Sequence, residues 1–168
     1  MGYRVMSSIN PFPNDPDRHE IWEILMRRDF EAFIAADWSR IAGDFLEEEF
    51  FGLDAGKVSN PDHWRLRFPD LPSYREEWLA QAAEFAATEL KGCSKLDFFF
   101  QSVVLCDIEI TGSRAVAHKK FDGAAESIAG EPVRILWQTL YFLKKREGRW
   151  RITGFVGYLP NPMPGAGH

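Results

Sequence analysis

Asp37 is the first side chain in this sequence that could carry acid–base chemistry. It follows a predicted helix whose aromatic stripe includes Trp22 and Phe33. If helical geometry continues to residue 37, the carboxylate faces the apolar interior. Burial raises the pKa of a carboxyl group, so Asp37 there could act as a general base. The alternative is that Asp37 caps a second helix beginning at Trp38.

Histidines are the other common general bases, and the sequence has four: His19, His63, His118 and His168. His63 lies in a predicted short turn over residues 60–66 and could line the mouth of a pocket. His118 lies within a predicted strand on the same parity as Arg114 and Lys120, which favours a polar face. We treat both as candidate catalytic residues and expect His19 and His168 in solvent.

The apolar run 133–143 also contains polar and aromatic side chains that can form hydrogen bonds. Tyr141 could donate a hydrogen bond to a developing oxyanion. Asp107 and Glu109 alternate with apolar residues and are expected in solvent. Several aromatic and amide side chains could orient a ligand in an apolar pocket. The alternative is that these side chains have only a structural role. These candidate ligand-binding residues are Trp22, Phe33, Trp64, Trp78, Trp137, Gln138 and Tyr158.

No spacing of histidine, cysteine and carboxylate residues matches a metal site, and no glycine-rich phosphate loop or nucleophile elbow occurs. We therefore expect neither a metal nor a cofactor. The net charge of −5 argues against nucleic-acid binding. No apolar run approaches the ~18 residues of a membrane span, and no export signal is apparent. Cys93 and Cys106 belong to no recognisable cysteine motif, and two such thiols are typical of a protein in a reducing compartment. We therefore expect a soluble cytoplasmic protein.

The elements that must position these side chains are helices in the first half and strands in the second. Ser73 and Glu76 form a predicted capping box for the third helix. The connection 54–72 is long, so we expect it to cover the pocket mouth, with Trp64 and Phe68 as lid residues. Glu147-Gly148 is a hairpin turn signal. The predicted helices span 17–36, 38–48 and 74–90, and the predicted strands span 96–110, 114–121, 133–143 and 149–158.

This order of elements resembles the nuclear transport factor 2-like superfamily, the cystatin-like α+β cone, and its polyketide-cyclase/dehydratase-like branch. The matching features are Asp37 after the first helix, the helix 74–90, and Gly148-Arg-Trp-Arg-Ile152. The resemblance implies three N-terminal helices packed in the concave face of a curved antiparallel sheet, which leaves a pocket. It also implies a homodimer through the outer face of the sheet. Dehydratases of that branch pair the aspartate with a histidine, which this sequence lacks over residues 85–102.

Residues 1–168 are thus expected to form one domain, with an irregular segment 1–16, a cone 17–158 and a proline-rich tail 159–168. The expected ligand is a small apolar carbonyl or hydroxyl compound, on which the protein could act as a cofactor-free isomerase, dehydratase or cyclase. The alternative is a non-catalytic ligand-binding or assembly module of the same fold.

Overall fold

The computed structural model describes residues 8–165, and its first helix is continuous but not uniform. Asp15 caps α2 (Pro16–Trp22) by accepting from the Arg18 amide, with proline in the first turn. The helix continues as a π-helical segment, η1 (Glu23–Arg28), and then as α3 (Asp29–Ala35). Most of the apolar stripe predicted for residues 17–36 is buried along this helix, and Phe33 and Ile34 at its end are partly buried.

The second helix predicted over residues 38–48 does not form. Ala36 adopts a left-handed conformation with φ 52°, which ends α3. Three short 3₁₀ turns follow instead: η2 (Trp38–Arg40), η3 (Ala42–Asp44) and η4 (Glu47–Glu49). Leu46 donates its amide to the Ile152 carbonyl, so this segment already follows the sheet edge rather than a helix axis.

The strands form one sheet in the order β2-β1-β6-β5-β4-β3. Only β1 and β6 run parallel; the other neighbours are antiparallel. Glu147 and Gly148, both with positive φ, make the turn of the β5–β6 hairpin, as predicted. The strands are β1 (Phe51–Asp54), β2 (Arg65–Phe68), β3 (Val103–Thr111), β4 (Arg114–Glu126), β5 (Pro132–Arg146) and β6 (Arg149–Leu159).

Two further helices complete the fold, and each corrects the sequence prediction. Asp70, not Ser73, caps α4 (Leu71–Ala86), because the Asp70 carboxylate accepts from the Ser73 amide. The predicted strand 96–110 begins instead as α5 (Lys95–Ser102), capped by Ser94. The end of α5 presses on β4 at Gly123, where a Cβ would lie 2.0 Å from the Ser102 hydroxyl oxygen.

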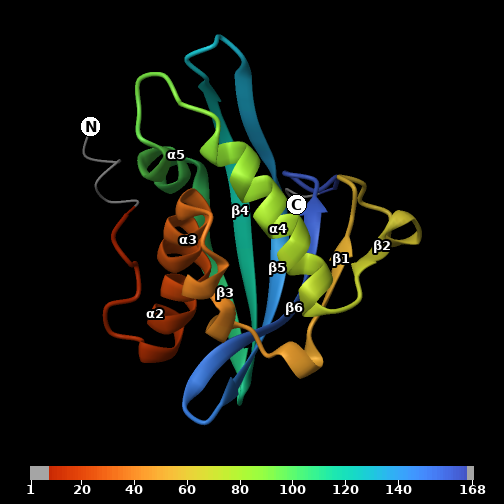
Figure 1. Cartoon of the computed structure of the whole chain (residues 1–168). Coiled ribbons are helices and arrows are strands. Elements are labelled where there is room, and N and C mark those ends of the chain that lie inside the picture. The colour runs from red at the N-terminus through yellow and green to blue at the C-terminus, as the bar shows by residue number, and fades with distance from the viewer. Residues whose placement is uncertain (1–7, 166–168) are drawn as a thin grey trace.

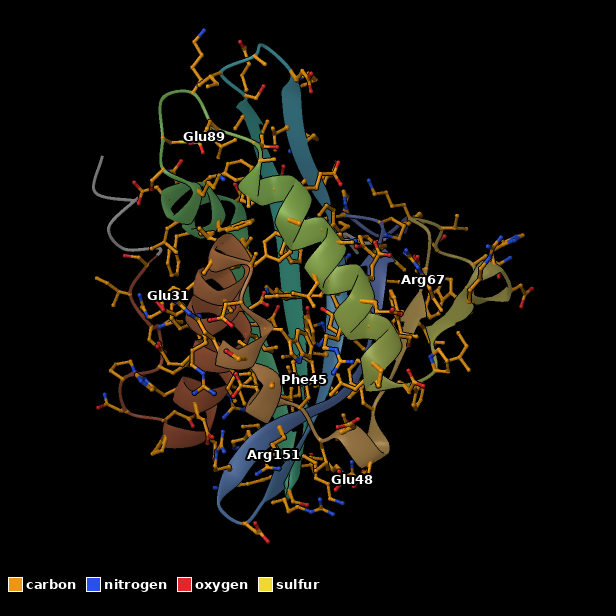
Figure 2. The ribbon with its side chains drawn as sticks, in the orientation of Figure 1. Glu31, Phe45, Glu48, Arg67, Glu89 and Arg151 are labelled. Atoms are coloured by element: carbon orange, nitrogen blue, oxygen red, sulfur yellow. The ribbon has the colours of Figure 1, made fainter. Side chains whose placement is uncertain are left out.

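Helices α2, α3, α4 and α5 lie on one face of the long twisted sheet, and α4 crosses the sheet obliquely (Figure 1). This arrangement confirms the predicted α+β cone. Charged side chains such as Glu31, Glu48 and Glu89 point outward, whereas Phe45 packs inward (Figure 2). A smaller apolar cluster covers part of the opposite, outer face and comprises Leu53, Ala55, Trp64, Leu140, Phe142, Val156, Leu159 and Met163. Within residues 8–165 no helix has the length and apolar character needed to cross a membrane.

Candidate functional site: an aromatic cavity with an ion pair in its wall

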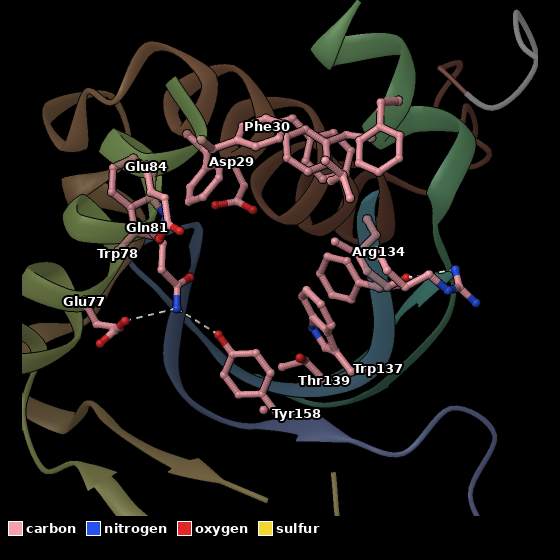
Figure 3. Close-up of a pocket in the computed structure, with 18 of the residues that line it drawn as sticks. Asp29, Phe30, Glu77, Trp78, Gln81, Glu84, Arg134, Trp137, Thr139 and Tyr158 are labelled. Atoms are coloured by element: carbon pink, nitrogen blue, oxygen red, sulfur yellow. Dashed lines mark hydrogen bonds between the residues drawn. The ribbon is translucent and has the colours of Figure 1, made fainter. Parts of the chain in front are cut away.

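A cavity of about 530 Å³ lies between the helices and the concave face of the sheet (Figure 3). Its volume suits a small organic ligand. Helices α3, α4 and α5 supply one wall, and strands β4, β5 and β6 supply the other. Aromatic rings dominate the lining, which includes Phe30, Phe33, Phe68, Tyr74, Trp78, Phe85, Phe98, Phe99, Phe121, Trp137, Tyr141, Phe155 and Tyr158.

Asp29 places a carboxylate in this apolar setting. It is the first residue of α3, directly after the π-helical segment. Figure 3 shows its carboxylate pointing into the open centre of the cavity. The side chain retains 29% exposure, and among residues 8–165 only Oδ2 has a hydrogen-bond partner. The other oxygen, Oδ1, is therefore available to a ligand.

The partner of Asp29 is Lys119, which is 1% exposed. Its ammonium lies 3.0 Å from Asp29 Oδ2 and also donates to the Leu25 carbonyl oxygen within the π-helical segment. Three rings surround it, with the Phe30, Phe121 and Tyr141 centroids at 5.0, 5.3 and 5.7 Å. A carboxylate, a carbonyl and three ring faces thus compensate a buried cation.

Two phenols adjoin this ion pair. Burial raises the pKa of Tyr74 and of Tyr141 well above the usual value, and the Asp29 carboxylate raises both further. Both hydroxyls are protonated at neutral pH, as an unperturbed tyrosine is, and can donate hydrogen bonds. In the described part of the chain, neither hydroxyl is hydrogen-bonded to another protein group. The site thus combines a carboxylate oxygen with two neutral donors.

A second polar group lies elsewhere on the cavity wall. Gln81 bonds to Glu77 Oε1 at 3.2 Å and to the Tyr158 hydroxyl at 3.1 Å (Figure 3). Arg67 holds the other oxygen of Glu77 at 2.7 Å. Burial raises the pKa of Tyr158, and the bond from Gln81 partly offsets that effect. In this network the Tyr158 hydroxyl oxygen accepts from Gln81, which holds the phenol in place.

Of the candidates named from the sequence, the structure brings Phe33, Trp78, Trp137, Tyr141 and Tyr158 together around the cavity. They come from α3, α4, β5 and β6. Phe68, expected as a lid residue, is also part of the lining, although it is buried against Tyr74 and Phe155.

Other candidates lie away from the cavity. Trp22 stacks on Phe100 in the core, because its side of the helix faces α5. Trp64 directly precedes β2, the edge strand of the sheet, and packs in the apolar cluster on the outer face. Gln138 has the even, outward parity of β5 and donates to the Pro160 carbonyl oxygen.

Asp37 caps the turn that begins at Trp38, which is one of the two roles that the sequence allowed. Its side chain accepts from the amide of Ser39 and from the Ser39 hydroxyl at 2.6 Å. The Ser39 hydrogen bonds lower the pKa of Asp37. The left-handed turn at Ala36 breaks the helical arc, so the carboxylate does not continue the apolar stripe into the cavity.

Neither candidate histidine adjoins the cavity. His63 is exposed in η5 (Pro61–His63). His118 faces outward opposite Leu140 of β5, whereas Lys119 and Phe121 have the inward parity of β4. In the described part of the chain, no group of histidine, cysteine and carboxylate residues is arranged to hold a metal.

Sequence reasoning missed Asp29, Lys119 and Tyr74. The available signal was parity: in strand 114–121, Lys119 alternates with Ala115, Ala117 and Phe121 on the apolar face. A lysine on that face requires a buried partner. Asp29 gave no such signal, since it follows two arginines on a helix and resembles a solvent-exposed carboxylate.

No protein-family model matches this sequence, and no significant match occurs among curated proteins. Solved structures with a similar fold do exist. A conserved protein from Planctomyces limnophilus is 15% identical with a TM-score of 0.56, over 84% of this chain and 94% of that one.

A nuclear transport factor 2-like superfamily protein from Salmonella enterica is 16% identical with a TM-score of 0.53, over 89% and 95% of the two chains. A nuclear transport factor 2-like protein of unknown function from Shewanella baltica is 16% identical with a TM-score of 0.52, over 85% and 93%. The polyketide-cyclase/dehydratase-like branch stays a prediction, but the superfamily resemblance is confirmed at the level of structure: this chain has the nuclear transport factor 2-like fold.

Proposed function

We propose that this protein binds a small, mostly apolar carbonyl or hydroxyl compound in the aromatic cavity and moves a proton on it without a cofactor. The observation that carries the proposal is the Asp29–Lys119 pair, which lies beside the buried phenols of Tyr74 and Tyr141 in the cavity wall. The reaction would be an isomerisation, a dehydration or a cyclisation. Each of these needs a base near carbon and a donor near oxygen.

The roles follow from the contacts. Lys119 holds Asp29 Oδ2, so Oδ1 would take the proton from the carbon next to the ligand carbonyl. Tyr141 or Tyr74 would donate to the carbonyl oxygen as negative charge develops there. The surrounding rings would bind the apolar body of the ligand and exclude water.

The experiment is proton exchange at carbon, which reports the chemistry before the natural substrate is known. The purified protein is incubated in D₂O with apolar ketones such as 2-tetralone and 2-indanone, and deuterium uptake is followed by NMR. We expect Asp29→Asn to slow catalysed exchange by about 10²–10⁴-fold. Tyr141→Phe should slow it by about 10²–10³-fold if Tyr141 is the oxyanion donor.

Asp37→Asn is the matched control, because Asp37 is a carboxylate at the end of the same helix but outside the cavity. It should leave exchange unchanged. Equal loss in both variants, or full exchange in Asp29→Asn, would contradict the assignment of Asp29 as the base.

The second candidate function is ligand binding without turnover. One observation favours it: Lys119 already neutralises Asp29, and no histidine adjoins the cavity in the described residues. Saturable binding of the ketones, measured by quenching of tryptophan fluorescence, with no deuterium uptake would support this alternative.

We also propose a homodimer through the outer face of the sheet. Leu140 and Phe142 lie there, half-buried in the cluster around Val156. Phe51 and Val104 add exposed apolar surface on other strands, at 49% and 53% exposure. A second copy of the chain would remove these side chains from water.

A further inference from the structure

Behind the ion pair lies a second, much smaller cavity of about 10 Å³. Asp29, Tyr74 and Tyr141 line both cavities, so these three side chains form the wall between them. The small cavity is otherwise enclosed by apolar side chains and by Asp44. The apolar residues are Ile24, Leu25, Ile41, Phe45 and Ile152.

Asp44 is buried, at 2% exposure, and only one of its oxygens is satisfied. Arg28 bonds to Oδ1, and Arg149 lies 3.7 Å from the same atom. Within the described residues Oδ2 has no hydrogen-bond partner. A buried carboxylate oxygen left without a donor destabilises the folded state.

The volume of the small cavity is about that of one water molecule, and such a water needs two to four polar partners. Asp44 supplies an acceptor, and the two phenols supply groups that both accept and donate. The geometry points to one water bound behind the wall, donating one hydrogen to Asp44 Oδ2 and the other to the Tyr141 hydroxyl oxygen.

This arrangement gives Asp44 a role in the site it does not touch. With its oxygen occupied by the water, Tyr141 would turn its own O–H away from the small cavity and toward the ligand. Tyr74 can donate a third hydrogen bond, to the oxygen of the water. Asp44 is then a positioning residue for the phenol, an inference that rests on the proposed function.

The first test needs no substrate and no variant. A crystal structure of the protein at a resolution that orders buried waters should show a water within hydrogen-bond distance of Asp44 Oδ2 and of the Tyr141 hydroxyl. An empty cavity, or a protein group bonded to Oδ2, would overturn the inference, whatever the outcome of the exchange experiment.

The second test uses Asp44→Asn in protein labelled with ¹³C at the tyrosine Cζ atoms. The amide oxygen of the variant can still accept from Arg28. An NH₂ group replaces Oδ2, so the water loses its acceptor. We expect the Tyr141 resonance to shift while that of Tyr158, which bonds to Gln81 outside the small cavity, stays in place.

Arg28→Gln is the control, because it removes the nearer of the two arginines at Oδ1 and leaves Oδ2 unchanged. It should leave the Tyr141 resonance unchanged. If Arg28→Gln produces the same shift as Asp44→Asn, or if Asp44→Asn produces none, Asp44 does not act on Tyr141 through a water.

Discussion

Lys119→Met is the most informative single change in this protein. Methionine fills a similar volume among the rings of Phe30, Phe121 and Tyr141 but cannot donate to Asp29 or to the Leu25 carbonyl. The carboxylate then lacks its only described partner. Because it remains in a mostly apolar wall, the folded state should lose stability although apolar contact is retained.

The magnitude follows from the degree of burial. Removing one partner of a buried ion pair costs about 3–5 kcal/mol. Asp29 keeps 29% exposure toward the cavity, so water can reach the stranded carboxylate and the lower end applies, about 3 kcal/mol. Asp29→Asn leaves Lys119 with the Leu25 carbonyl, the rings and an amide oxygen, and should cost about 1–2 kcal/mol.

The assay is urea denaturation of both single variants and the double variant. We expect the double variant to lose about 2 kcal/mol less than the sum of the single losses, because the second change removes the charge that the first one strands. Lys120→Met is the matched control: its side chain is 45% exposed on the outward parity of β4 and should change stability by less than about 0.5 kcal/mol.

The reasoning fails if Lys119→Met is as stable as the wild type, or if the two single losses add within about 0.5 kcal/mol. Either result would mean that the lysine and the carboxylate are not energetically coupled.

Three further predictions concern other parts of the molecule. Asp37→Ala should lower the melting temperature while Asp37→Asn leaves it nearly unchanged, because asparagine also caps; equal losses would exclude the capping role. Hydrogen bonds from Lys145 and Trp150 lower the pKa of Asp17, so its contribution to stability is present above the unfolded pKa and lost as pH falls through the folded value. Unfolding followed by circular dichroism in acid should therefore be less pH-dependent in Asp17→Asn than in the wild type. Leu140→Asp should convert a dimer to a monomer of 19.3 kDa by light scattering, and a wild-type protein already monomeric at micromolar concentration would exclude the dimer.

The sheet was largely predictable from sequence because its signals are local. The run of β-branched, aromatic and other apolar residues over 133–143 and the Glu147-Gly148 turn signal predict the long hairpin from local sequence, and the structure contains that hairpin. The error at 96–110 has a physical reason: Phe98, Phe99 and Phe100 favour a strand by propensity. All three are buried as a helix instead, because Ser94 caps the segment and α3 packs against it.

The site was harder to predict because its members are distant in sequence. Asp29 and Lys119 meet only when the junction of η1 and α3 packs against β4. No pattern within the helix distinguishes Asp29 from a surface carboxylate. The cavity rings Phe33, Trp78 and Trp137 were found because large aromatic residues at helical or strand spacing already mark the concave face. Asp37 was a candidate for the cavity because it continues the apolar arc of the helix in sequence. The left-handed turn at Ala36, which the helical pattern does not predict, directs it away from the cavity.

The π-helical segment Glu23–Arg28 has a consequence for how this site could have arisen. A π-turn contains about one residue more than an α-turn, and such turns are frequent at functional sites. Successive residues of an α-helix are about 100° apart around the axis. An additional residue in a regular α-helix would turn everything beyond it by about that angle, whereas the π-turn accommodates the additional residue within one turn. Deletion of a single residue between Glu23 and Arg28 could therefore restore an α-turn while α3 stays in phase with α2 and Asp29 still faces the cavity. Such a deletion would separate the two contacts of Lys119: its bond to Asp29 belongs to α3 and would persist, whereas its bond to the Leu25 carbonyl belongs to the turn that is rebuilt.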